Sequence, residues 1–144
     1  MIKVNKVSTP EGVIQALAIR EQVFVDERGG RFEDEVDEFE QVSEHFIAHD
    51  EDGTFCGSAR WRFAEMGIRL EKFAVLAKFR GCGVGKAMSV AVLEDIQCNP
   101  NTAGFPIYLF ASEEAVPLYQ TLGFNKKEES IIKNQQKHFL MIKE

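Results

Sequence analysis

A glycine-rich turn is the feature of this sequence that most constrains the fold. Residues 80–86 read RGCGVGK and lie between a predicted strand and a predicted helix. Glycine adopts positive φ and lets the backbone approach a ligand closely, and a helix that begins there presents free N–H groups that stabilise an anion. The glycines alternate with other residues, so neither the dinucleotide fingerprint nor the Walker pattern fits. The turn leaves two interpretations open, an anion-binding loop or a tight turn before a helix.

Apolar periodicity on both sides of this turn predicts an α/β domain. It places strands at residues 2–7, 45–49, 54–63, 68–75, 107–111, 124–131 and 139–142. Helical spacing predicts one helix from residue 10 to about Val25, a second over 84–98, and a short third helix capped by Ser112. The three strands between residues 45 and 75 form an antiparallel run. We therefore expect a mixed, mostly antiparallel central sheet with helices on both faces.

Two segments allow more than one interpretation. The first helix begins either with Ser8 and Glu11 as a capping box or with Thr9 as N-cap and Pro10 at the first helical position. Residues 31–45 carry seven carboxylates, and the spacing of the few apolar residues among them does not decide between helix and loop. A run of this kind is typical of a solvated face.

Composition narrows the class of protein. The 144 residues are 44% hydrophobic and 28% charged, which fits one domain with its own core, and we expect residues 1–144 to form it. A formal net charge of −6 argues against a nucleic-acid binder. The longest apolar runs are too short to cross a bilayer, and the first residues resemble a strand rather than a secretory signal. Three cysteines without C-x-x-C spacing indicate neither disulfides nor a metal site. We expect a soluble, cytoplasmic protein.

Two motifs in order resemble those of a known enzyme family. Residues 75–85, with Arg80-Gly81-x-Gly83-x-Gly85, resemble motif A of the GNAT superfamily of acetyl-CoA-dependent N-acetyltransferases. Residues 115–124 look like motif B of that superfamily, ending in Tyr119-x-x-Leu-Gly-Phe. About thirty residues, with a helix and a strand, separate the two. This resemblance implies a single N-acetyltransferase domain with the GNAT fold.

Further motifs are similar to the bacterial ElaA-like branch of that superfamily. They are Arg20-x-x-Val23-Phe24-Val25-x-Glu27, Glu35-x-Asp37, His45 before a strand, and Lys137-His138-x-x-Met141. Two positions depart from the branch. Arg28 stands where Gln is usual and Glu40 where a second Asp is usual, so the identity of the acceptor is not carried over by the resemblance.

The resemblance also implies where acetyl-CoA, the expected co-substrate, is held. Backbone N–H groups of the glycine-rich turn would cradle its pyrophosphate, and the preceding strand would pair with its pantetheine arm and offer an N–H to the thioester carbonyl. The residues implied in donor binding are Phe73, Ala74, Val75, Arg80, Gly81, Cys82, Gly83, Val84, Gly85 and Lys86.

Two side chains are candidates for proton transfer. Tyr119 matches the motif B tyrosine, which in many GNAT enzymes protonates the departing sulfur, although its spacing also fits a core aromatic residue. Strand alternation puts Glu71 on the face shared by Phe73 and Val75, where burial would raise its pKa and suit a general base. The alternative for Glu71 is a cross-strand or solvent-facing charge.

Acceptor binding is the least determined part of the sequence. Glu35 and Asp37 match the branch motif and would attract a cationic amine by focusing negative charge in a cleft. His138 is implied as a further acceptor-site residue by its match to the branch. The expected reaction is acetyl transfer to a primary amine of a small molecule or peptide, by direct attack in a ternary complex.

Two other functions are compatible with these residues. The N-terminal motifs are also reminiscent of acyl-homoserine-lactone synthases, which share the GNAT fold, and a non-catalytic acyl-CoA-binding sensor would keep the same loop. The retained Tyr119 favours an enzyme over a sensor. No metal, nucleic-acid or membrane partner is expected, and a homodimer is possible because GNAT proteins often dimerise.

Overall fold

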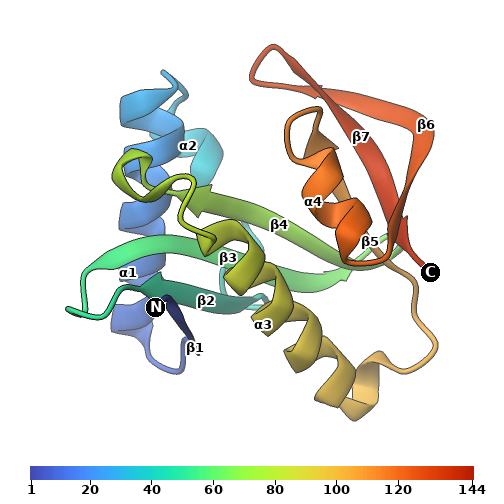
Figure 1. Cartoon of the computed structure of the whole chain (residues 1–144), viewed down its shortest axis with the longest axis horizontal. Coiled ribbons are helices and arrows are strands. Elements are labelled where there is room, and N and C mark those ends of the chain that lie inside the picture. The colour runs from blue at the N-terminus through green and yellow to red at the C-terminus, as the bar shows by residue number, and fades with distance from the viewer.

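A seven-stranded mixed sheet forms the centre of the protein (Figure 1). The computed structural model describes all 144 residues. Strand order across the sheet is β1-β2-β3-β4-β5-β7-β6, and only the β4–β5 pair is parallel. The strands are β1 (Lys3–Lys6), β2 (Glu44–His49), β3 (Phe55–Ala64), β4 (Gly67–Val75), β5 (Ile107–Ser112), β6 (Phe124–Lys133) and β7 (Gln136–Lys143). The expected mixed, mostly antiparallel sheet is confirmed.

Helices cover both faces of this sheet. Figure 1 shows α3 (Val84–Cys98) and α4 (Val116–Thr121) on the near face and α1 (Pro10–Arg20) on the far face. Two buried clusters fill the layers: the larger packs α3 and α4 against the sheet, and the smaller packs α1 against it. We call these the α3 face and the α1 face. Shorter helical turns complete the chain: the π-helical segment Glu21–Glu27, α2 (Phe32–Glu35), Ala77–Phe79 and Pro100–Thr102.

The first helix begins as one of the two predicted alternatives. Thr9 is the N-cap, its hydroxyl accepts a hydrogen bond from Gly12 N at 3.1 Å, and Pro10 occupies the first helical turn. The α-helix ends at Arg20, five residues before the predicted end, and the chain widens into a π-helix that ends at Glu27. π-helical turns inside helices are rare and occur often at functional sites.

Strands β4 and β5 separate soon after they start. Their parallel pairing is limited to Ile68 with Ile107 and Arg69 with Tyr108, and beyond this point β5 pairs only with β7. Figure 1 shows the two strands diverging, with the α3–α4 side in front of them. Side chains from both faces of the sheet therefore reach the gap between the strands.

A bulge in β4 changes which residues share a face. Ser58 pairs with Ala74 and Arg60 pairs with Glu71, so β4 has one residue more than β3 between these points. The extra residue is accommodated at Lys72, whose φ of 58° lies in the left-handed region. Alternation is consequently out of phase on the two sides of the bulge.

The predicted position of Glu71 is therefore wrong. Phe73 and Val75 pack against the α3-face cluster, whereas Ala74 belongs to the α1-face cluster. Glu71 pairs with Arg60 and lies on the α1 face. Simple alternation fails here because the sequence of β4 gives no sign of the bulge.

Two predictions near the C-terminus also need correction. The third helix begins at Val116 rather than at Ser112, because residues 113–115 form a separate turn in which Ala115 N donates to Ser112 O at 2.9 Å. The last two strands form a longer hairpin than predicted. Asn134 and Gln135, with φ of 52° and 65°, make a two-residue turn of the kind that needs positive φ at both positions.

The acidic segment is folded inward around two buried arginines. Arg20 and Arg60 are each 1% exposed. Arg20 donates to Glu35 at 3.2 Å and to both oxygens of Glu40 at 2.9 and 2.8 Å. Arg60 donates to Asp37 at 3.0 and 2.6 Å and to Glu71 at 2.8 Å. Glu35, Asp37 and Glu40 are thus internal partners of the arginines, whereas Glu33, Asp34 and Glu38 are exposed. The predicted solvated face is therefore only part of this segment.

Loss of Arg60 should destabilise the fold strongly. We expect Arg60→Ala to lower the free energy of unfolding by about 3–5 kcal/mol, because it leaves the buried Glu71 and the partly buried Asp37 without their main partner. Urea unfolding measures this difference.

Arg31→Ala is the matched control. It removes the Arg31–Glu33 pair, in which both side chains are mostly exposed, so its effect should stay within about 1 kcal/mol. Equal effects of the two substitutions would contradict the structural role given to Arg60.

Candidate functional site

One cleft passes through the gap between β4 and β5. Its volume is about 780 Å³, and its lining comes from β4, β5, α4, the glycine-rich turn and the β6–β7 hairpin. Because the two strands are separated there, the cleft has a part on each face of the sheet. We call these parts the α3-face half and the α1-face half.

The glycine-rich turn forms the wall of the α3-face half. Gly81 and Gly83 have φ of 78° and 83°, and Gly83 is the N-cap of α3, a helix of fifteen residues. The N–H groups at the start of a helix carry partial positive charge and bind anions. The turn is therefore built for an anion at the mouth of the cleft.

The structure places most of the predicted donor-binding residues in the cleft lining. Those that line it are Phe73, Val75, Arg80, Gly81, Gly83, Val84, Gly85 and Lys86. Ala74 does not, because the bulge turns its side chain to the α1 face, where it is 1% exposed. Cys82 is also outside the lining and is exposed on the turn.

Arg80 holds the turn rather than presenting a free charge. Its guanidinium pairs with both carboxylate oxygens of Glu27 and donates from Nε to the carbonyl oxygen of Val75 at 3.1 Å. Glu27 is the last residue of the π-helix. The Arg80–Glu27 pair thus connects the N-terminal helical region to the glycine-rich turn, and Lys86 remains the unpaired cation of that turn.

Tyr119 lies deep in the α3-face half. Its ring packs edge-to-face on Phe73 and Phe124, with centroid distances of 6.3 and 5.8 Å. Burial raises the pKa of Tyr119 to about 12, in spite of a hydrogen bond with the side chain of Ser89. The phenol therefore keeps its proton through the neutral range and is available as a donor. Tyr119 is both a core residue and a cleft residue, so the two alternatives for it are compatible.

Glu71 does not have the raised pKa that was expected of a base. Burial by itself would raise its pKa, but the charge of Arg60 and hydrogen bonds from Arg62 and Arg60 outweigh burial and lower it. Arg62 Nε and Arg69 Nε lie 2.7 and 3.2 Å from the carboxylate. Of the two alternatives for Glu71, the structure favours the cross-strand charge.

The α1-face half is lined by polar and positively charged side chains. His138 pairs with Ser112 across β5 and β7, and Lys133 pairs with Gln136 at the end of the hairpin, so all four sit at the cleft. Burial and the positive charges of Lys133 and Arg28 lower the pKa of His138, although its contact with the Gln136 carbonyl opposes this. The imidazole is therefore neutral at neutral pH.

Glu35 and Asp37 do not line the cleft. Glu35 is 8% exposed and faces Arg20 and Lys72, and Asp37 is held by Arg60. Burial opposes ionisation of Asp37, but the hydrogen bonds and charge of Arg60 lower its pKa to about 2. The hypothesis that these two carboxylates attract a cationic amine is not supported by this geometry.

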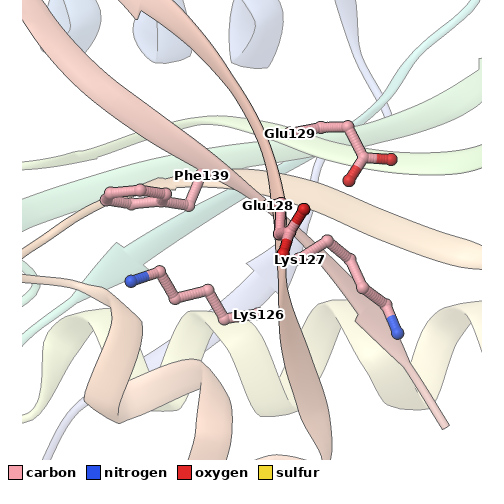
Figure 2. A pocket seen from close by; sticks show the side chains of 5 residues that line it. All are labelled: Lys126, Lys127, Glu128, Glu129 and Phe139. Atoms are coloured by element: carbon pink, nitrogen blue, oxygen red, sulfur yellow. The ribbon is translucent and has the colours of Figure 1, made fainter.

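A second, more open hollow lies on the outside of the β6–β7 hairpin (Figure 2). It is lined by Lys126, Lys127, Glu128, Glu129 and Phe139. Figure 2 shows Lys126 beside Phe139, and its amine lies 4.0 Å from the ring centre, whereas Lys127 and Glu129 extend away on the other side of the strand. Its polar groups do not converge, so it is not the candidate site.

Sequence reasoning missed the cations of the α1-face half. Arg69, Lys72 and Lys133 line the cleft but belong to no motif. The β4 bulge and the hairpin turn bring these side chains together. Neither feature contains a glycine from which the sequence could predict it. No group of three or more His, Cys, Asp or Glu side chains is arranged to hold a metal ion. None of the helices is both long and apolar enough to cross a bilayer.

Comparisons with known proteins agree with this geometry. The family model described as an acetyltransferase (GNAT) domain matches residues 6–144. The uncharacterized N-acetyltransferase YjcF of Bacillus subtilis is 36% identical to this chain over 114 residues, 79% of each protein.

Two solved structures share the whole fold. Escherichia coli ElaA superposes with a TM-score of 0.81 at 22% identity and covers 100% of both chains. An acyl-CoA N-acyltransferase from Pseudomonas aeruginosa also has a TM-score of 0.81, at 20% identity, covering 100% of this chain and 99% of the other. The resemblance to the GNAT superfamily found in the sequence is confirmed. This chain is a member of the GNAT acetyltransferase domain family.

Proposed function

We propose that the protein transfers an acetyl group from acetyl-CoA to a primary amine by direct attack in a ternary complex. One observation carries this proposal: a single cleft passes through the sheet, with an anion-binding turn on one face and polar groups on the other. A donor in the α3-face half and an acceptor in the α1-face half would meet between β4 and β5. The similar P. aeruginosa structure is that of an acyl-CoA N-acyltransferase, which supports the choice of donor.

The chain offers a group for each part of the donor. Backbone N–H groups at residues 81–86 would bind the pyrophosphate, and Lys86 adds a charge at the cleft wall. The pantetheine arm would lie along β4 near Phe73 and Val75. Beyond Arg69 the edge of β4 that faces β5 has no strand partner, so its backbone groups would be free to bind the thioester carbonyl. A donor aimed at the developing oxyanion typically contributes about 2.7–4 kcal/mol.

The proposed step moves one proton off the amine and one onto the sulfur. The amine nitrogen attacks the thioester carbon, the C–N bond forms and the C–S bond breaks. Tyr119, which is protonated at neutral pH, would supply a proton to the leaving thiolate. Neutral His138 suits acceptance of the amine proton better than Glu71. When its Nδ1 donates to the Gln136 carbonyl at 3.1 Å, its Nε2 is left as acceptor.

Acetyl-CoA binding tests the donor part of the proposal. At about 100 times its Kd, the ligand should add about 2.7 kcal/mol of stability and raise Tm by several degrees. NADH and ATP are the control ligands, and no shift is expected with either. Thermal unfolding with and without each ligand measures the effect.

A pair of variants tests whether the glycine-rich turn is responsible for the increase in Tm with acetyl-CoA. Gly85→Glu should abolish it, because Gly85 has room for a side chain and the new carboxylate would repel the phosphates. Val90→Glu adds the same charge at an exposed position farther along α3 and should keep the shift. A full shift with Gly85→Glu, or none with the wild type at millimolar acetyl-CoA, would overturn the donor assignment.

Replacement of Tyr119 tests the proton donor. We expect Tyr119→Phe to lower kcat by about 10²–10⁴-fold, because general acid catalysis is lost, while acetyl-CoA affinity stays nearly unchanged. Release of free CoA thiol in the presence of an amine measures kcat.

Tyr108→Phe is the control, since Tyr108 is the only other tyrosine, is equally buried and does not line the cleft. An unchanged kcat for Tyr119→Phe would remove the assignment. Donor binding without any release of thiol would instead support a sensor.

A further inference from the structure

The α1-face half of the cleft carries positive charge on a chain whose net charge is −6. We propose that the acceptor bears an anionic group, a carboxylate or a phosphate, close to its amine, and that Lys133, Arg28 and Arg69 bind this group. This inference rests on the proposed function, because it names the class of amine that the same cleft would take. It reverses the expectation that the site attracts a cationic amine.

Two cations of this half, Lys133 and Arg28, lack anionic partners of their own. Lys133 and Arg28 form no ion pair and no side-chain hydrogen bond, and the Arg28 guanidinium rests only over the ring of Phe24 at 5.5 Å. The Nε atom of Arg69 is buried and makes no hydrogen bond, although it lies 3.2 Å from the carboxylate of Glu71. These side chains line the cleft together, so their free N–H groups are available to a ligand there.

Few negative charges near these cations are unpaired. Two carboxylates line the cleft: Glu114 lies in the turn before α4 and forms no ion pair, and Glu71 is held by Arg60 and Arg62 from β3 as well as by Arg69. Glu35 lies 3.5 Å from Lys72 but also receives a hydrogen bond from Arg20. The four cations of the half, Arg28, Arg69, Lys72 and Lys133, therefore outnumber its free negative charge.

Clustering of these cations has an energetic cost that an anion would offset. Burial and the charge of Lys72 lower the pKa of Lys133 to about 8, against the opposing effect of Glu35. At neutral pH Lys133 is still mostly charged. An anionic ligand would gain charge-assisted hydrogen bonds from Lys133 and the two arginines, which are stronger than neutral ones. A cationic ligand would add to the repulsion.

These cations are separate from the group proposed to bind the donor phosphates. The glycine-rich turn and Lys86 belong to the α3-face half, and β4 lies between them and the α1-face cations. Arg69 precedes the bulge and pairs with Tyr108 on the α1 face. The cations of the α1-face half therefore remain available to bind the acceptor when the donor occupies the α3-face half.

Binding of matched amines to the CoA-saturated protein tests the inference without requiring turnover. The probes are β-alanine against β-alaninamide, and 2-aminoethyl phosphate against ethanolamine, so each pair differs only in the anionic group. We expect the anionic member of at least one pair to bind about tenfold or more tightly by protein NMR titration. The pair with the larger ratio identifies carboxylate or phosphate as the source.

Two charge-neutral variants locate the preference. Lys133→Gln should bring the ratio of Kd values close to one and leave CoA binding unchanged, since Lys133 has no structural partner. Lys127→Gln removes the same charge outside the cleft, where Lys127 pairs with Glu144, and should keep the ratio. Arg28→Gln is a second variant in the site, with the same expected loss.

Three outcomes would overturn the inference. They are equal or tighter binding of the neutral amines, a preference that survives Lys133→Gln and Arg28→Gln, and no saturable binding of any of the four probes. Failure of CoA to bind is a separate outcome that overturns the proposed function. In that case the same titrations on the CoA-free protein still decide whether the α1-face half binds anions.

Discussion

The separation of β4 from β5 is the constraint on which the rest of the site depends. If the two strands stayed paired beyond Arg69, the sheet would be continuous there and no cleft would connect its two faces. The bulge at Lys72 acts at the same place, because it shifts Phe73 and Val75 to the α3 face while Glu71 stays on the α1 face. One cleft therefore has two chemically different walls.

The net charge of the protein does not describe the charge of its cleft, because several of the acidic side chains are paired with arginines in the interior. The acidic residues between positions 33 and 44 include Glu35, Asp37 and Glu40, which neutralise Arg20 and Arg60 in the interior. Breaking a buried ion pair of this kind leaves an uncompensated charge, so these contacts restrict how the segment can fold. With these carboxylates held by arginines, the cleft itself keeps an excess of positive charge.

The sequence predicts the framework of the fold well, because its signals are local. Alternating apolar residues mark most strands, Thr9 and Pro10 mark one of the two predicted starts of α1, and alternate glycines mark the turn before α3. The two GNAT-like motifs identify the family. These features need only neighbouring residues, so a single sequence reveals them.

Features that depend on long-range contacts could not be predicted. The β4 bulge lies in an ordinary run of residues, and it places Glu71 beside Arg60 instead of beside Phe73. The end of the β6–β7 hairpin is polar and has no glycine at its turn, so Lys133 was not placed near the cleft. The acidic segment lacks periodicity because its partners, Arg20 and Arg60, are distant in sequence.

The most direct test of the division of the cleft into an α3-face half and an α1-face half is amide hydrogen–deuterium exchange of the full chain with and without CoA. Binding of the donor on the α3 face should slow exchange over residues 73–87, which form the end of β4, the glycine-rich turn and the start of α3. Residues 131–138, at the tip of the hairpin on the other face, should exchange at an unchanged rate. Protection of residues 131–138 with none over residues 73–87 would contradict the division of the cleft.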